Sequence, residues 1–300
     1  MSRNSPYAAH ARFIRPAYIA SAPILVILVL FGFEFILAFT GTLSDQILPE
    51  DRAFPDASPF GTVLGFAIFA VALILFHGLV KVVHKRGIST MLGPTGQLWH
   101  DGRRTLVAVG GLLLAIEVIM PSYGYEDIVE TRNGLAWAAM LPLGFVAILI
   151  QCTTEEVVYR GYLQQQVAVL TKGPASYILV PSIIFGVGHY WNGWGMSDGL
   201  LYAFWATLLG IACADLTART GSIGAAIGLH TANNLYVTLI FAEQGGPSSG
   251  LALFLTELVD WGSYDYGVDA LLSVWSLLDI AFSAVMVLIM WLSARIAIRR

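Results

Sequence analysis

Residues 135–170 read LAWAAMLPLGFVAILIQCTTEEVVYRGYLQQQVAVL, an apolar run interrupted by charged residues near its middle. A membrane-spanning helix needs about 20 mainly apolar residues, and residues 135–152 provide most of such a span. Residues 163–170 continue the apolar pattern beyond the charges, and Thr-Lys-Gly-Pro at 171–174 ends it. Glycine suits the position after a helix and proline the start of the next one. The stretch therefore predicts one long helix that carries charged residues into a membrane.

The rest of the composition extends this interpretation to the whole chain. Hydrophobic residues make up 57% of the 300 residues and charged residues only 12%, about half the charged share of a soluble domain. We therefore expect an all-α polytopic membrane protein, surrounded by the lipid bilayer, with about eight transmembrane helices. The expected spans are residues 17–40, 60–82, 104–121, 135–152, 175–189, 199–217, 222–241 and 270–293.

Basic residues orient the expected spans. Cytoplasmic loops of membrane proteins are enriched in lysine and arginine. With eight alternating spans, one side holds 13 of the 16 basic residues and both termini: Arg3, Arg12, Arg15, Lys81, Lys85, Arg86, Arg103, Arg104, Lys172, Arg219, Arg295, Arg299 and Arg300. This distribution predicts a multi-pass protein of the inner (plasma) membrane with both termini in the cytoplasm, and an interfacial segment over residues 86–100.

Charge and cysteine content argue against nucleic-acid binding and against special roles for the cysteines. The net charge of -4 and the lack of a basic face exclude nucleic acid as a partner. The two cysteines, Cys152 and Cys213, lie in apolar segments and suggest neither a disulfide framework nor a zinc cluster. Cys152 as a nucleophile would need an electropositive environment, and its acidic neighbours make small apolar packing the better interpretation.

Charged residues inside a span are costly and usually face one another or a cavity. Glu156 and Arg160 are four residues apart, so they share one helix face and can pair. Glu155 lies about 100° around the helix, which leaves it free for chemistry. By itself, the cluster could equally be a charged helix end at the membrane surface.

Two further segments bring polar groups into the expected spans. Residues 185–189 read Phe-Gly-Val-Gly-His, and residues 230–234 read His-Thr-Ala-Asn-Asn. The two glycines are expected to leave space beside the His189 imidazole, and His230 and Asn234 share a helix face. His189 would lie about 20 Å deep, so it can meet Glu155 only if the fourth helix continues to about residue 170.

These groups support two kinds of hydrolysis. A buried carboxylate and an imidazole can together deprotonate water, and a second imidazole with an amide can stabilise an oxyanion. Alternatively, Glu155, His189 and His230 could hold a zinc ion with an open position for water. The spacing of the residues does not separate a cofactor-free mechanism from a zinc-dependent one.

The three segments resemble the CAAX-protease and bacteriocin-processing (CPBP or Abi) family of intramembrane endopeptidases, which includes the Rce1-like prenyl proteases. The family pattern E-E-x-x-x-R, F-x-x-x-H and H-x-x-x-N appears in order at residues 155–160, 185–189 and 230–234. The resemblance implies a catalytic core over residues 135–241. Residues 1–134 would then hold three N-terminal spans with the interfacial segment, and residues 242–300 an outer loop and the last span.

The resemblance also implies roles for the residues. Glu155 would activate water with His189, Glu156 and Arg160 would orient Glu155, and His230 and Asn234 would form the oxyanion site. The substrate would be a membrane-associated or lipidated protein or peptide, and the short loops are typical of bacterial members, although nothing in the sequence identifies a prenyl pocket.

Two other classes of function compete with a protease. A proton-coupled transporter would also use buried acids, and Glu34, Glu117 and Asp279 provide three more. It would predict broken helices or an inverted repeat, and the sequence has neither. A non-proteolytic scaffold or immunity protein would keep the fold without needing every reactive group.

Overall fold

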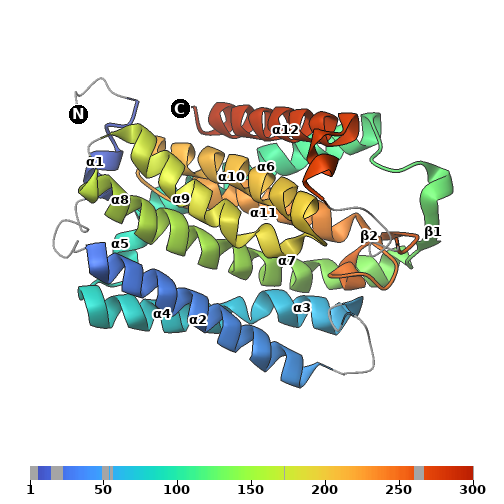
Figure 1. Ribbon diagram of the computed structural model, residues 1–300, viewed down its shortest axis with the longest axis horizontal. Coiled ribbons are helices and arrows are strands. Elements are labelled where there is room, and N and C mark those ends of the chain that lie inside the picture. The colour runs from blue at the N-terminus through green and yellow to red at the C-terminus, as the bar shows by residue number, and fades with distance from the viewer. Residues whose placement is uncertain are drawn as a thin grey trace.

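The computed structural model describes residues 6–14, 23–48, 54, 57–171, 173–259 and 267–299. Eight long helical rods run alternately up and down the same axis of the molecule (Figure 1). They are α2 (Pro23–Ile47), α3 with α4 (Pro59–Ala67 and Phe69–His84), α6 (Thr95–Ile119), α7 with its continuation to Leu170, α9 (Pro174–Gly188), α10 (Met196–Thr220), α11 (Gly224–Leu239) and α12 (Val274–Ile298). Short helices α1 (His10–Phe13) and α5 (Ser89–Leu92) lie between them.

Five of these rods are long and apolar enough to cross a membrane, which makes the chain a polytopic membrane protein of mostly helical structure. They are Pro23–Ile47, Pro59–His84, Gly134–Leu170, Met196–Thr220 and Val274–Ile298. The other three rods were also expected to span the membrane, but they are too short or too charged to meet the same criteria. Helices α9 and α11 have only 15 and 16 residues, and α6 carries Asp101, Arg103 and Arg104 in its first half. Residues 17–22 of the first expected span lie outside the described part of the chain.

The long helix over residues 135–170 is confirmed. It runs as α7 (Gly134–Glu156), a π-helical segment (Val157–Leu163) and α8 (Gln164–Leu170) without a break. The π-helical segment begins directly after Glu156 and contains Arg160. An i→i+5 segment of this kind widens the helix locally, and such segments are frequent at functional sites. Nothing in the sequence indicated this change of helix type.

The expectation of an all-α protein was wrong in one detail, because the structure also contains a small sheet. Strands β1 (Ile128–Thr131), β3 (Phe254–Thr256) and β2 (Phe241–Glu243) pair in that order, β1 antiparallel and β2 parallel to β3. The sheet joins loops at one end of the bundle (Figure 1). Backbone N–H and C=O groups outside the helices need other hydrogen-bond partners, and the three strands provide these hydrogen bonds to one another.

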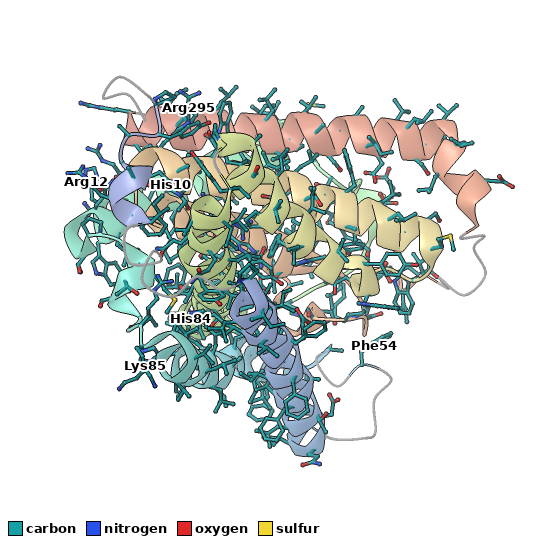
Figure 2. All side chains as sticks on the ribbon, turned by 60° about the vertical axis from the view of Figure 1, so that its left-hand side comes forward. His10, Arg12, Phe54, His84, Lys85 and Arg295 are labelled. Carbon is teal, nitrogen blue, oxygen red and sulfur yellow. The ribbon has the colours of Figure 1, made fainter. Side chains whose placement is uncertain are left out.

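The opposite end of the bundle gathers basic residues. Figure 2 shows Arg12, Lys85 and Arg295 at one end, with Phe54 towards the other. Helix α1 and the last turn of α12 also lie at the basic end (Figure 1). The two described ends of the chain therefore lie at the same end of the bundle. The expected interfacial segment over residues 86–100 forms α5 and the first turns of α6 at this end.

Close helix contacts position the polar residues. A Cβ atom at Gly186 of α9 would lie 1.9 Å from the Thr207 hydroxyl oxygen and 2.5 Å from the Ala203 carbonyl oxygen of α10. At Gly210 of α10, a Cβ would lie 3.1 Å from an Arg160 nitrogen. Both glycines therefore let α9, α10 and the π-helical segment approach closely, which brings His189 to the same region as the Glu155–Glu156 pair.

Candidate active site

Glu156 forms the buried centre of the polar cluster. Its Oε1 accepts hydrogen bonds from Arg160 Nη1 at 3.0 Å and from His230 Nδ1 at 2.8 Å. The side chains of Glu156 and Arg160 are fully buried, and that of His230 is 3% exposed. The Arg160 guanidinium also lies over the Phe185 ring, 4.5 Å from its centre, a favourable cation–π contact. The ion pair predicted between Glu156 and Arg160 is thus confirmed, and it extends to His230.

Glu155 occupies a different environment from its neighbour. Its side chain keeps 12% of its surface exposed, and its Oε2 lies 3.6 Å from His230 Nε2. With Nδ1 of His230 bonded to Glu156, Nε2 is the ring nitrogen that faces Glu155. Glu155 Oε2 is fully enclosed beside this nitrogen. The exposed remainder of the Glu155 side chain is the part that a water molecule can reach.

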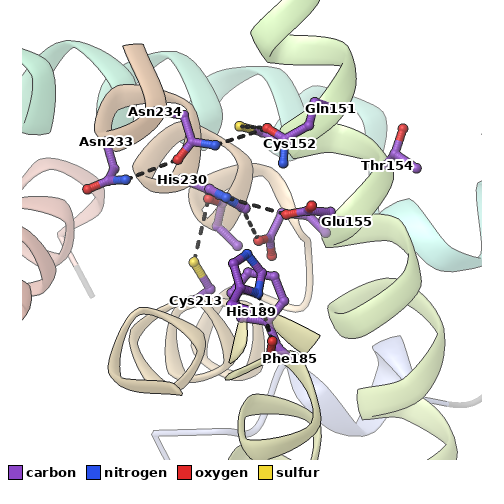
Figure 3. Close-up of polar contacts among 12 residues, drawn as sticks. Gln151, Cys152, Thr154, Glu155, Phe185, His189, Cys213, His230, Asn233 and Asn234 are labelled. Carbon is purple, nitrogen blue, oxygen red and sulfur yellow. Dashed lines mark hydrogen bonds and ion pairs between the residues drawn. The ribbon is translucent and has the colours of Figure 1, made fainter. Parts of the chain in front are cut away.

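His189 joins the cluster through a different contact. Its Nδ1 lies 2.8 Å from the Phe185 carbonyl oxygen. A carbonyl oxygen only accepts hydrogen bonds, so Nδ1 carries the proton and Nε2 is the basic nitrogen of the neutral ring. Figure 3 shows His189, the residue directly after α9, on the same side of the long helix as Glu155 and His230. Its ring also packs at 4.4 Å on Phe185.

Asn234 is held by two other amides. Its Nδ2 donates to Gln151 Oε1 at 2.9 Å, and its Oδ1 accepts from Asn233 Nδ2 at 3.0 Å. Gln151 lies four residues before Glu155, on the same face of α7. The Cys152 thiol also donates to the Gln151 oxygen, at 3.2 Å. The three amides therefore form a hydrogen-bonded row beside the two carboxylates (Figure 3).

The structure brings all six expected site residues into one region but changes how they pair. We expected Glu155 to act with His189 and His230 to act with Asn234. Among the described side chains, no hydrogen bond or ion pair joins Glu155 to His189 or His230 to Asn234. His230 contacts both carboxylates instead. The difference arises because α11 packs directly on α7, and the sequence does not fix the rotation of one helix against the other.

One expectation is changed by the packing and one residue was overlooked. We had expected Gly186 to leave space beside the His189 ring, but the space at Gly186 is occupied by Thr207 and Ala203 of α10. Gln151 was missed entirely, although its i, i+4 spacing from Glu155 was a readable signal.

The residues do not form a ready zinc site. Within the described ranges, no group of three His, Cys, Asp or Glu side chains is placed to hold a metal ion. The hydrogen bonds at Nδ1 of His189 and of His230 leave both Nε2 atoms available as ligands, but these two rings and the Glu155 carboxylate are not grouped around one point. The set of Glu155, His189 and His230 therefore does not fit a zinc ion without rearrangement.

Cys152 has the surroundings of a packing residue. It is fully buried against Ile148, Leu239 and Leu251. Its thiol donates to Gln151. An activated cysteine needs an exposed, electropositive environment, and this one is enclosed and next to two carboxylates.

Comparisons with known proteins relate the chain to one family model and one curated protein. Residues 137–236 match the family model described as Type II CAAX prenyl endopeptidase Rce1-like. The matched segment contains all six expected site residues. The chain is also 27% identical over 233 residues to the uncharacterized protein YyaK of Bacillus subtilis (strain 168), covering 75% of this chain and 76% of that protein. No solved structure matches the chain.

Proposed function

We propose, on the premise that residues 137–236 are an Rce1-like type II CAAX prenyl endopeptidase domain, that this protein hydrolyses a peptide bond inside the membrane. The observation that carries the proposal is the arrangement of the two neighbouring carboxylates. Glu156 is fully buried and bound by Arg160 and His230, while the Glu155 side chain is 12% exposed and places only its enclosed Oε2 beside His230 Nε2. One carboxylate is thus structural and the other is available to a substrate.

Glu155 is the general base of this proposal. It takes a proton from a water molecule as the water oxygen bonds to the peptide carbonyl carbon, and the carbonyl oxygen becomes negatively charged. Collapse of this intermediate breaks the carbon–nitrogen bond, and Glu155 returns the proton to the departing amine. A base that gives its proton back in this way leaves the enzyme unchanged after each cycle.

The histidines assist from fixed orientations. Glu156 holds the His230 ring so that Nε2 points at Glu155, where it helps to polarise the water or, once protonated, donates towards the oxyanion. Asn234 keeps one of its two N–H groups after donating to Gln151, and that group can also serve the oxyanion. His189 presents its basic Nε2 from α9 as a second proton acceptor.

The membrane arrangement belongs to the same proposal. Helices α6, α9 and α11 would complete eight passages with the five apolar rods, and the basic end that carries Arg12, Lys85 and Arg295 would face the cytoplasm. The catalytic core would cover residues 135–241 of a protein in the plasma membrane of a bacterium. The substrate is proposed to be a membrane-associated or lipidated protein or peptide.

Cleavage by purified protein in detergent tests the proposal. A library of membrane-associated peptides is incubated with wild type, Glu155→Gln and His230→Ala, and the products are identified by mass spectrometry. We expect cleavage by wild type and at least a 10³-fold loss in both variants. Glu117→Gln is the matched control, because Glu117 is an acid of α6 that bonds Ser122 and Tyr236 away from the cluster. Equal cleavage by wild type and Glu155→Gln would disprove the proposed base.

Chelation separates the two hydrolytic mechanisms. Because the three candidate ligands do not form a zinc site as they lie, we expect activity to survive metal removal. Loss of activity that Zn²⁺ restores would establish the zinc-dependent alternative. Absence of any cleavage, together with substrate-dependent proton flux in vesicles, would favour a transporter.

A further inference from the structure

The geometry points to Gln151 as a further catalytic residue that donates hydrogen bonds to the oxyanion; this inference rests on the proposed peptidase function. Gln151 is 7% exposed, lies one helical turn before Glu155 and contacts Asn234 of α11. It belongs to none of the three family segments at residues 155–160, 185–189 and 230–234. The assignment depends on which end of its amide faces the site.

The row of amides sets the direction of the Gln151 side chain. Asn233 Nδ2 donates to Asn234 Oδ1, and Asn234 Nδ2 donates to Gln151 Oε1. The Cys152 thiol donates to the same Gln151 oxygen at 3.2 Å. If the Gln151 amide were reversed, its NH₂ group would face two donors, and its oxygen would turn towards the side of the helix that carries the Glu155 carboxylate. Both changes are unfavourable.

The Gln151 nitrogen is consequently free. Among the described residues, none accepts a hydrogen bond from Nε2, and this atom is not one of the fully enclosed polar atoms of the protein. In Figure 3, the nitrogen points away from Asn234 and towards the part of α7 that carries Glu155. Gln151 thus offers two unused N–H groups, whereas Asn234 has already committed one of its two.

A free amide donor beside the general base has a clear use. When water attacks the peptide carbonyl, the carbonyl oxygen gains a full negative charge, and N–H groups held in place in a poorly solvated site stabilise that charge. Gln151 Nε2 and the remaining N–H of Asn234 come from neighbouring helices and are fixed by their mutual hydrogen bond. We therefore assign the oxyanion site to the pair of Gln151 and Asn234.

Three variants distinguish a donor from a positioning role. Gln151→Met keeps the length of the side chain and removes both polar atoms. Gln151→Glu keeps an oxygen for Asn234 and Cys152 but removes the N–H donors. Gln164→Met is the matched control, because Gln164 is a buried glutamine farther along the same continuous helix, and its amide donates to the Ala214 carbonyl oxygen, away from the carboxylates.

Two measurements are made on each purified full-length variant. The first is the cleavage of a peptide that the wild type cuts, analysed as kcat and KM. The second is the binding of an alanine-based phosphinic peptide, in which a charged tetrahedral phosphorus replaces the reacting carbonyl, compared with the corresponding uncleaved peptide. Binding does not require turnover, so it tests Gln151 even if the peptidase proposal fails.

We expect both Gln151 variants to lose about 10²-fold in kcat with little change in KM, as for removal of an oxyanion donor in other hydrolases. Their affinity for the phosphinic peptide should fall by a similar factor, while their affinity for the uncleaved peptide stays within a few fold. Full kcat and phosphinic binding in Gln151→Glu would overturn the inference, because that result would reduce Gln151 to an acceptor that positions Asn234. Failure of wild type to bind the phosphinic peptide, or equal losses in Gln164→Met, would overturn it too.

Discussion

His230 lies between two carboxylates, with Nδ1 2.8 Å from Glu156 Oε1 and Nε2 3.6 Å from Glu155 Oε2. The two acids are adjacent in the chain, yet one belongs to a fully buried ion pair and the other keeps an exposed edge. The His230 imidazole therefore connects the buried Glu156–Arg160 ion pair to Glu155, the carboxylate that is available to a substrate.

This relationship predicts very different effects of two adjacent substitutions on the free energy of unfolding. Glu156→Gln should lower the free energy of unfolding by about 3–5 kcal/mol, because it leaves Arg160 buried without a charged partner. Glu155→Gln should change it by less than about 1 kcal/mol, because Glu155 lies outside the buried Glu156–Arg160 ion pair and its side chain stays partly exposed. Thermal unfolding of both variants in the same detergent measures the difference. Equal losses in the two variants would contradict the division of roles between these carboxylates.

The contact between α9 and α10 predicts a strong effect of a single methyl group. A Cβ at Gly186 would lie 1.9 Å from the Thr207 hydroxyl oxygen, so Gly186→Ala must push the helices apart and should cost about 1–3 kcal/mol. It should also lower activity, since His189 lies three residues further on. Gly111→Ala in α6 is the control, because a Cβ there meets nothing within 4 Å; it should leave unfolding and activity unchanged. Identical behaviour of the two variants would show that the helices do not approach as described.

The buried thiols predict resistance to thiol reagents. Cys152 and Cys213 are both fully buried, and the proposed reaction uses neither. Incubation with N-ethylmaleimide should leave peptide cleavage within about two-fold of the untreated protein, and Cys152→Ala should retain most of its activity. Inactivation by the reagent that Cys152→Ala prevents would instead indicate a cysteine nucleophile.

His10 predicts that acid releases the N-terminal segment. The ring is buried, stacks at 4.3 Å on Tyr177, and neither of its nitrogens has a hydrogen-bond partner among the described residues. Burial lowers the pKa of His10 from 6.5 to about 4. When residues 6–14 are detached, His10 takes up a proton below pH 6.5. When they are docked, His10 takes up this proton only near pH 4. Docking is therefore strongest above pH 6.5 and weakens as the pH falls from 6.5 to 4, by roughly 3 kcal/mol in total.

Hydrogen exchange of residues 6–14 at several pH values measures this release. Exchange in wild type should accelerate as the pH falls below 6.5, after correction for the intrinsic pH dependence of exchange. His10→Phe keeps an aromatic ring against Tyr177 but has no proton to gain, so its corrected exchange should stay constant. The same acid response in both proteins would assign the effect to another group, such as Asp215, which accepts a hydrogen bond from Tyr7.

The sequence by itself determined the class of protein and the long helix over residues 135–170, and it identified the candidate site residues other than Gln151. Apolar runs of spanning length leave few alternatives to helices in a membrane, and the cost of burying charge marked Glu155, Glu156, Arg160, His189 and His230 as a group. Spacing along one helix also sufficed for the Glu156–Arg160 ion pair, because residues four apart share a face.

Only the tertiary structure decided which groups meet between helices. The rotation of α11 against α7 and the close contact of α9 with α10 depend on packing across the whole bundle. These contacts placed His230 rather than His189 beside Glu155, and the Asn234 amide donates a hydrogen bond to Gln151. The loops at one end of the bundle also form a small sheet, although an all-helical chain was expected. The sequence determines which side chains lie on each face of a helix, whereas the assembled fold determines which faces pack against each other.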